Sequence, residues 1–210
     1  MNTPEAIRTD KLLLVEGQDE KNFCGKLLSA LKIKNVQIIN AEGQSRFRGL
    51  VPAVTAATGF DRVRCLGFVR DAEKSTALSS FQGILSIIRD RTGFPLPCLP
   101  GRVKSENGYK TGIFIMPDNS SPGMLENLCL SSVRGSPLAD AAAGYIRIAE
   151  QLLDTGRKEK FNERKAEVQA YLAGCVPIAG SCGIGAEKGY WDFSSPVFTA
   201  IKNFLASLYG

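Results

Sequence analysis

Short apolar runs alternate with polar turns along the first ninety residues. The apolar runs occupy residues 11–15 (KLLLV), 36–40 (VQIIN) and 63–69 (VRCLGFV), and each leads into a polar turn. A short continuous apolar run is typical of a buried parallel strand. Apolar residues three or four positions apart follow each turn, which indicates an amphipathic helix. These helical stripes are Phe23, Leu27, Leu28 and Leu31; Phe47, Leu50, Val51 and Val54; and Leu78, Phe81, Leu85 and Ile88.

Three strand–turn–helix units in succession favour a parallel sheet with right-handed crossovers. Residues 92–107 are rich in proline and glycine and are predicted to form a loop, with room for one edge strand. A further strand is predicted at 112–116 (GIFIM), followed by a short helix around 124–130.

The last third of the chain is predicted to be mostly helical. Apolar stripes cover residues 138–153 and 161–172. A final helix over 196–208 begins with Pro196 and takes Ser194 or Ser195 as its cap. The segment 174–189, with its spaced glycines, is predicted to be a flexible loop.

The predicted fold class is therefore α/β, a mainly parallel sheet of four to five strands flanked by helices. We expect an α/β core over residues 1–132 and a helical C-terminal region over 133–210 that packs on it.

Composition narrows the chemistry. The chain of 210 residues contains no histidine. This excludes Ser-His-Asp and Cys-His nucleophile activation and His-ligated catalytic zinc. Any catalysis must then use carboxylates, other polar side chains, or a hard metal ion held by oxygen.

The six cysteines form no C-x-x-C pair and are predicted to be reduced core residues. No apolar run approaches the ~18 residues that span a membrane, and no secretory signal is recognised, so we expect a cytoplasmic protein without membrane contact. The formal net charge of +5 is compatible with a polyanionic partner.

Acidic residues follow the predicted strands at their carboxyl ends. Glu16 and Asp19 follow the first strand, Asp71 and Glu73 the third, and Asp118 the fourth. In an open parallel α/β sheet, ligands bind beyond these ends, so the acids are expected to converge. Clustered carboxylates repel one another, and a bound divalent cation relieves that repulsion; Mg²⁺ favours such oxygen ligands.

This combination of a Glu-Gly-x-Asp turn (Glu16 to Asp19) and a later Asp-x-acid turn (Asp71 to Glu73) resembles the Toprim domain. That Mg²⁺-binding module is shared by topoisomerases, bacterial primases, small ribonucleases and nucleases related to the phage overcoming-lysogenization-defect protein. The resemblance covers about residues 10–120. It implies that Glu16, Asp71 and Glu73 are catalytic and that Mg²⁺ or Mn²⁺ is the cofactor. Glu73 departs from the family pattern, in which a second Asp is usual.

The segment 115–128 (IMPDNSSPGMLENL), with later elements at Lys165 and 190–193 (YWDF), resembles uncharacterised bacterial and phage Toprim-like proteins. This resemblance implies Glu126 as a further metal ligand and Lys165 as a phosphate contact. Glu126, with Asp19 behind it, would complete a second metal position.

Basic and aromatic residues supply the candidates for nucleic-acid contacts. Arg46, Arg48 and Arg70 lie closest to the acidic turns, and we favour Arg70 as a phosphate ligand. For 158–165, a solvated helix face competes with a phosphate-tracking strip. For Tyr190 and Trp191, packing of the last helix competes with stacking on bases.

Two functions from different classes follow. The first is a Mg²⁺-dependent nuclease that cleaves phosphodiester bonds in DNA or RNA, including RNA processing of the kind done by small Toprim ribonucleases. The second is a catalytically weak metal- or nucleotide-binding effector regulated by a partner. The resemblance adds a partner ATPase to the expectations, and the sequence leaves the oligomeric state open.

Overall fold

The computed structural model describes residues 6–210, without the side chains of Gln44, Ser45 and Arg91. A five-stranded sheet forms its centre, in the order β2-β1-β3-β5-β4. β1 pairs in parallel with β2 and β3, β3 pairs in parallel with β5, and β4 pairs antiparallel with β5. The predicted α/β class with a mainly parallel sheet is thus confirmed. The strands are β1 (Lys11–Val15), β2 (Val36–Asn40), β3 (Cys65–Asp71), β4 (Val103–Glu106) and β5 (Tyr109–Met116).

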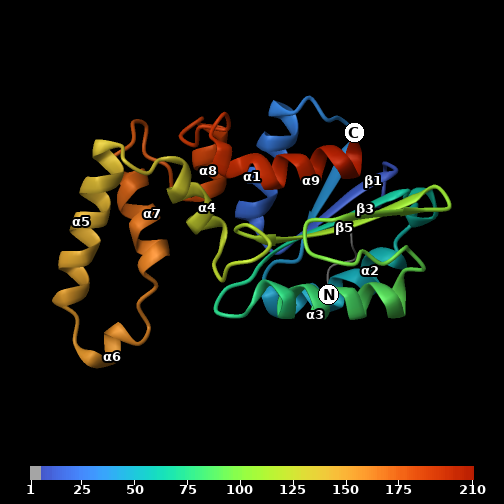
Figure 1. Cartoon of the computed structure of the whole chain (residues 1–210), viewed down its shortest axis with the longest axis horizontal. Helices are drawn as coiled ribbons and strands as arrows, with labels where there is room; N and C mark the ends of the chain where they lie inside the picture. Colours follow the sequence, from blue (N-terminus) through green and yellow to red (C-terminus); the bar gives the residue numbers. More distant parts are fainter. Residues whose placement is uncertain (1–5) are drawn as a thin grey trace.

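Helices cover both faces of this sheet (Figure 1). In chain order, the helices are α1 (Gln18–Ala30), α2 (Gln44–Thr55), α3 (Ala77–Arg91), α4 (Leu125–Ser132), α5 (Pro137–Gln151), α6 (Thr155–Lys158), α7 (Glu163–Ala173), α8 (Cys182–Glu187) and α9 (Thr199–Tyr209). Short 3₁₀ turns lie at Phe60–Arg62 and Pro196–Phe198.

Alternation along the strands divides the core into two layers. In β1, Leu12 and Leu14 face the layer under α2 and α3, whereas Leu13 and Val15 face the layer under α1 and α9. Successive side chains of a strand point to opposite faces, so a strand covered on both sides must be apolar throughout. This explains why the uninterrupted LLLV run identified β1.

Helix α9 packs on one face of the sheet, mainly over β5 and β3, and its last residue bonds to β1, the first strand of the chain. The Tyr209 hydroxyl donates to the Leu12 carbonyl at 2.7 Å, and the Lys11 ammonium donates to the Tyr209 carbonyl at 2.5 Å. Gly67, in the middle of β3, leaves the space this requires, because a Cβ there would collide with the Tyr209 hydroxyl.

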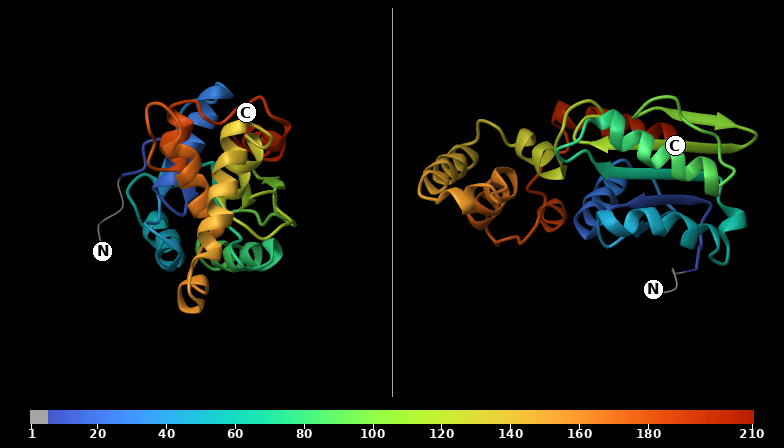
Figure 2. Two further views of the ribbon diagram at one scale, coloured as in Figure 1. Left: turned by 90° about the vertical axis from the view of Figure 1, so that its left-hand side faces the viewer. Right: turned by 90° about the horizontal axis from the view of Figure 1, so that it is seen from below.

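Helices α5 and α7 pack against each other and, with α6 at their turn, form a hairpin over residues 137–173. Figures 1 and 2 show this hairpin projecting from the end of the α/β body. Its base contacts the body through α4, which packs on α7.

The prediction of a flexible loop over 174–189 is wrong for its second half, where α8 forms. The glycines there permit close packing rather than flexibility. A Cβ on Gly183 would lie 2.8 Å from both the Asn22 Cβ and the Asp19 carbonyl oxygen, so α8 can approach α1 only with glycine at this position. Trp191 is buried, stacks on Tyr171 and donates to the Cys182 carbonyl at 2.8 Å, which supports the packing interpretation of that residue.

Smaller differences concern element ends. The third strand is displaced two residues toward the C-terminus relative to 63–69, because it continues through Arg70 into Asp71. The final helix begins with a 3₁₀ turn at Pro196, and its α-helical part starts at Thr199. All six cysteines are free, as predicted, and four are buried. Cys98 is exposed and Cys65 only partly buried, so these two are not core residues. Within residues 6–210, no helix has the length and apolarity needed to cross a bilayer.

Candidate functional site

The acids predicted from the strand ends lie at one edge of the sheet. β1 and β3 are neighbours in parallel register, with Val15 opposite Val69, and Asp71 lies opposite Met116 of β5. Glu16 and Asp71 therefore leave adjacent strands at their carboxyl ends, where ligands bind in open α/β sheets.

Asp71 is the most deeply buried of these acids. Its residue is 8 % exposed, and its Oδ1 accepts a hydrogen bond from the Leu125 amide at the start of α4, at 3.1 Å. Burial raises the pKa of the Asp71 carboxyl well above its usual value, and the nearby charges of Glu20, Glu16 and Glu126 raise it further. Asp71 is thus the point at which several negative groups meet.

Glu16 lies beside Arg70 and has a strongly perturbed acidity. Burial raises the pKa of Glu16 to about 7; Arg70 opposes the shift, and Glu20 and Glu73 add to it. The distance from Arg70 Nε to Glu16 Oε2 is 3.6 Å, close enough for an ion pair but too long for a hydrogen bond. Both atoms are buried without a hydrogen-bond partner among the described residues. A buried, unpaired carboxylate oxygen is costly and is expected to serve a ligand.

Glu20 belongs to the cluster, although its type and position in the sequence did not single it out. It stands in the first turn of α1 and is 9 % exposed. Burial raises its pKa, and the charges of Asp19 and Glu126 contribute in the same direction. The sequence did hold a signal for Glu20, namely its spacing of four residues from Glu16. A helix that starts directly after Gly17 turns Glu20 back toward the end of the strand.

Two further charged residues, Glu126 and Lys165, come to the cluster from helices α4 and α7. Glu126 stands in the first turn of α4, where a negative charge suits the helix dipole, and its side chain is 16 % exposed. Lys165, from α7, has its ammonium nitrogen 3.9 Å from Glu126 Oε1. The elements that carry this pair differ from those that carry Glu16 and Asp71, so the site joins the sheet to the base of the hairpin.

Asp19 and Glu73 lie at the margin of the cluster. Asp19 Oδ1 accepts from the Gly183 amide at 3.1 Å and so ties α1 to α8, while its charge is still felt by Glu20. The Glu73 side chain is exposed, and its backbone has a φ of 53° and pairs with Gly123 in both directions at 2.8 and 2.9 Å. A left-handed conformation in a non-glycine residue stores strain, a feature that clusters at functional sites.

Other candidates have local partners. Asp118 folds back on its own loop, where bonds from Ser121 and Ser120 outweigh burial and lower its pKa. Arg46 pairs with Glu42 at 2.6 Å on the exposed surface of α2.

The donor set was tested for its fit to a divalent cation. Among the residues that the structure describes, no group of three or more acidic or cysteine side chains is arranged to hold a metal ion. Mg²⁺, however, commonly takes only one or two carboxylates and keeps several waters. The unpaired Glu16 oxygen and the mutual repulsion around Asp71 are what such a water-rich site would relieve. The described acids therefore form no closed metal cage, and a Mg²⁺ ion bound here would have to keep most of its water ligands.

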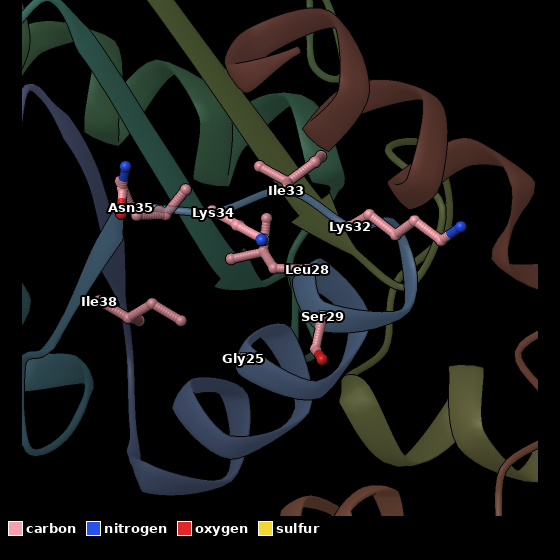
Figure 3. A pocket seen from close by; sticks show the side chains of 9 residues that line it. Gly25, Leu28, Ser29, Lys32, Ile33, Lys34, Asn35 and Ile38 are labelled. Atoms are coloured by element: carbon pink, nitrogen blue, oxygen red, sulfur yellow. The ribbon is translucent and has the colours of Figure 1, made fainter.

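A hollow lies away from the acidic cluster. About 310 Å³ open between the end of α1 and the start of β2, lined by Leu28, Ile33 and Ile38 with Lys32 and Lys34 (Figure 3). It is at the amino ends of the strands, the opposite end from the acids. A second hollow of about 250 Å³ adjoins α4, α5 and α7, beside Asn127 and Arg164.

The chain and its fold were compared with known proteins and solved structures. No curated protein matches the chain. A crystal structure of a hypothetical protein from Pyrococcus horikoshii OT3 shares the fold, with a TM-score of 0.53 and 20 % identity over 96 % of this chain and 95 % of that one. Two weaker likenesses are the C-terminal regions of OLD proteins. That from Burkholderia pseudomallei gives a TM-score of 0.48 at 12 % identity, over 95 % of this chain and 98 % of that one.

The region from Xanthomonas campestris pv. campestris gives a TM-score of 0.47 at 12 % identity, over 96 % and 92 % of the two chains. One family pattern, described as "protein of unknown function (DUF3226)", matches residues 10–210. Because this match takes in the sheet, the acidic cluster and the hairpin, the chain belongs to the DUF3226 family.

Proposed function

We propose that the chain is a Toprim-type nuclease that uses Mg²⁺ or Mn²⁺ to hydrolyse phosphodiester bonds in DNA or RNA. The observation that carries the proposal is the burial of Glu16, Glu20, Asp71 and Glu126 within electrostatic reach of one another. Buried carboxylates that repel one another destabilise a fold, so their presence at a ligand-binding edge favours a functional role.

The basic side chains beside the acids support a phosphate-containing substrate. Arg70 and Lys165 each approach a carboxylate at 3.6 and 3.9 Å without a hydrogen bond. A metal ion bound by the carboxylates would replace the basic groups as their partner. Arg70 and Lys165 would then be free to bind a phosphate. A site holding acids for a metal ion and bases for phosphate has the donor set of phosphoryl-transfer chemistry.

Roles follow from position. When bound, Mg²⁺ neutralises phosphate charge and lowers the pKa of a bound water. Asp71 and Glu20, the most buried acids, would hold the ion, with Glu126 and the marginal Asp19 and Glu73 completing its surroundings. Glu16 would serve as a ligand or move a proton. Arg70 and Lys165 would orient the phosphate.

The test is cleavage of single- and double-stranded DNA and RNA by the purified protein with Mg²⁺ or Mn²⁺. Asp71→Asn and Glu20→Gln keep side-chain size while removing charge, and each is expected to lower the rate by at least about 100-fold. Chelation with EDTA should abolish cleavage.

Asp140→Asn is the matched control, because Asp140 is an exposed acid on α5, outside the cluster. Its activity should equal that of the wild type. Unchanged cleavage by Asp71→Asn would show that the acidic cluster is not the active site.

A second candidate is a metal- or nucleotide-binding effector with little activity of its own. The absence of a three-acid metal cage among the described residues and the exposed, strained Glu73 favour it. Titration with Mn²⁺ by thermal shift separates the two. Stabilisation that depends on Asp71, without turnover of any nucleic acid, would support the effector.

A further inference from the structure

Three large apolar side chains on α5 and its C-cap are exposed to solvent. Tyr145 is 65 % exposed, Ile148 61 % and Leu152, directly after the helix, 82 %. Scattered single apolar residues are normal on a protein surface, but a continuous row on one element indicates an interaction site. With the exposed Ala141 they form the α5 stripe, residues 141, 145, 148 and 152.

The spacing of the α5 stripe is four, three and four residues. At about 3.6 residues per turn, this places all four side chains in one narrow row along the helix. Rows with this alternation form the seam of paired helices, in which each side chain inserts between residues of the facing helix. The stripe therefore fits another α-helix better than a strand or a flat surface.

The α5 stripe is separate from the face that packs within the hairpin. Ala139, Ala142 and Ile146 are the buried residues of α5, and α7 is the helix that packs on α5. Figures 1 and 2 show the hairpin, with α5, projecting from the body. The high exposure of Tyr145, Ile148 and Leu152 places the stripe on the solvent side of this helix.

We propose that a second copy of this chain docks on the α5 stripe, with its own α5 antiparallel to the first, to form a two-fold dimer. An antiparallel pairing places Leu152 opposite Ala141 of the second copy and Tyr145 opposite Ile148 of the second copy. The most exposed side chain, Leu152, thus meets the smallest, Ala141, and each copy makes both contacts. Such self-complementarity is what a two-fold interface requires.

The rows beside the stripe favour an identical partner. Ala149 lies on one side, and Gly144 and Gln151 lie on the other, so the flanking positions carry no charge. Charges at these positions usually select a different partner or repel a copy of the same helix. Asp140 and Arg147 lie one row further from the stripe, and Arg147 is the closer of the two to its middle. Its guanidinium lies 3.9 Å from the point where a Gly144 Cβ would stand, so it leans toward the amino end of α5. The two Arg147 side chains of an antiparallel pair would then lean apart.

Two further exposed apolar residues lie at the base of the hairpin. Val176 is 91 % and Ile178 70 % exposed, and they follow Gly174, which is packed against Leu138 at the start of α5. The tip of the second hairpin would reach this base in the antiparallel arrangement. Specific interfaces bury about 800 Å² per partner. The stripe of one helix is smaller than this, so the base is needed and the dimer is expected to be reversible.

The first test is sedimentation velocity of the full chain over a wide concentration range. The wild type should pass from monomer to dimer as concentration rises. Ile148→Glu should weaken the dimer on the order of 100-fold, because each copy would bury an unpaired charge in the seam. Leu99→Glu is the matched control, since Leu99 is 56 % exposed but lies before β4, outside the hairpin.

The second test fixes the orientation by disulfide cross-linking under a copper–phenanthroline oxidant, in a Cys98→Ser background that removes the exposed cysteine. Ala141→Cys with Leu152→Cys should yield a covalent dimer. Within one helix these positions are about 16 Å apart, too far for an internal disulfide. Leu152→Cys alone should stay monomeric.

A wild type that is monomeric at all concentrations overturns the proposal, as does a dimer that Ile148→Glu leaves intact. Cross-linking by Leu152→Cys alone would overturn the antiparallel arrangement, because that residue faces its own copy only in a parallel pair. Docking of a different protein in place of a second copy would appear as a wild-type monomer.

Discussion

The buried carboxylates set the properties of individual residues at the site. Burial is the main cause of the raised pKa values of Glu16, Glu20 and Asp71, and neighbouring carboxylates add to each shift. The protein retains these groups at a cost in stability, which is the usual relation between a functional site and its fold. This cost has a measurable dependence on pH.

In the presence of a chelator, the melting temperature is predicted to fall as the pH rises from 5 to 8. The Glu16 pKa is about 7 in the folded protein against an ordinary 4.5. Between these values the folded state binds more protons than the unfolded state, so the free energy of unfolding decreases with pH. Differential scanning fluorimetry of the wild type and Glu16→Gln measures the effect.

Glu16→Gln removes the titrating group and should give a flatter profile with a higher melting temperature at pH 8. Adding Mn²⁺ should restore stability to the wild type most strongly at pH 8, where the carboxylates are free of protons. A wild-type melting temperature that rises steadily toward pH 8 without metal would contradict the raised pKa of Glu16.

At the scale of elements, α8 shows how a short helix can depend on one glycine. Gly183→Ala is predicted to destabilise the protein by about 1–3 kcal/mol, because the added Cβ meets the α1 backbone and Asn22. Urea unfolding followed by circular dichroism measures the loss.

Gly25→Ala, inside α1, is the control. A Cβ there would meet only Ile38 Cδ1 at 3.8 Å, which is ordinary contact. It should be neutral or stabilise by about 0.5–1 kcal/mol, as alanine does in a helix interior. Equal effects of the two substitutions would show that the α1–α8 approach is not tight at Gly183.

The elements that the sequence predicted well are those with continuous or periodic apolar residues. β1 and β5 are examples, because strands buried on both faces leave little alternative to an apolar run. The helix α1 was predicted from its periodic apolar residues. α8 was missed because its six residues are mostly small, and its position depends on contact with α1 rather than on its own pattern. The four-residue α6 has no apolar stripe at all.

Only part of the candidate site was predicted, because only some of its residues are placed by the order of the strands. Residues directly at strand ends, such as Glu16 and Asp71, are placed by the topology alone. Glu20 depends on the register at which α1 begins, and the tie from Asp19 to α8 depends on a helix that was not predicted. Side-chain direction at a helix start is decided by tertiary packing, which a single sequence does not contain.

At the scale of the whole molecule, Tyr209 joins the two ends of the described chain. Tyr209→Phe is predicted to lower the free energy of unfolding by about 1 kcal/mol, because the Leu12 carbonyl loses a buried donor. For a chain of this size this corresponds to roughly 2–4 °C in melting temperature.

Tyr145→Phe, which removes an exposed hydroxyl, should change stability by less than about 0.5 kcal/mol. If the two substitutions had the same effect, the hydrogen bond to Leu12 would contribute nothing to stability.

The docking of α9 on the sheet also bears on how fast the protein folds. Lys11 and Tyr209 are 198 positions apart, and Leu12 and Tyr209 are 197. Contacts between such distant residues form only after the intervening chain has been ordered, and a fold that depends on them acquires its native state slowly. Until α9 arrives, the sheet face that includes Leu13 and Phe114 lacks its cover, and intermediates of this kind self-associate. Refolding yield is therefore expected to fall with protein concentration through the step that seats the last helix.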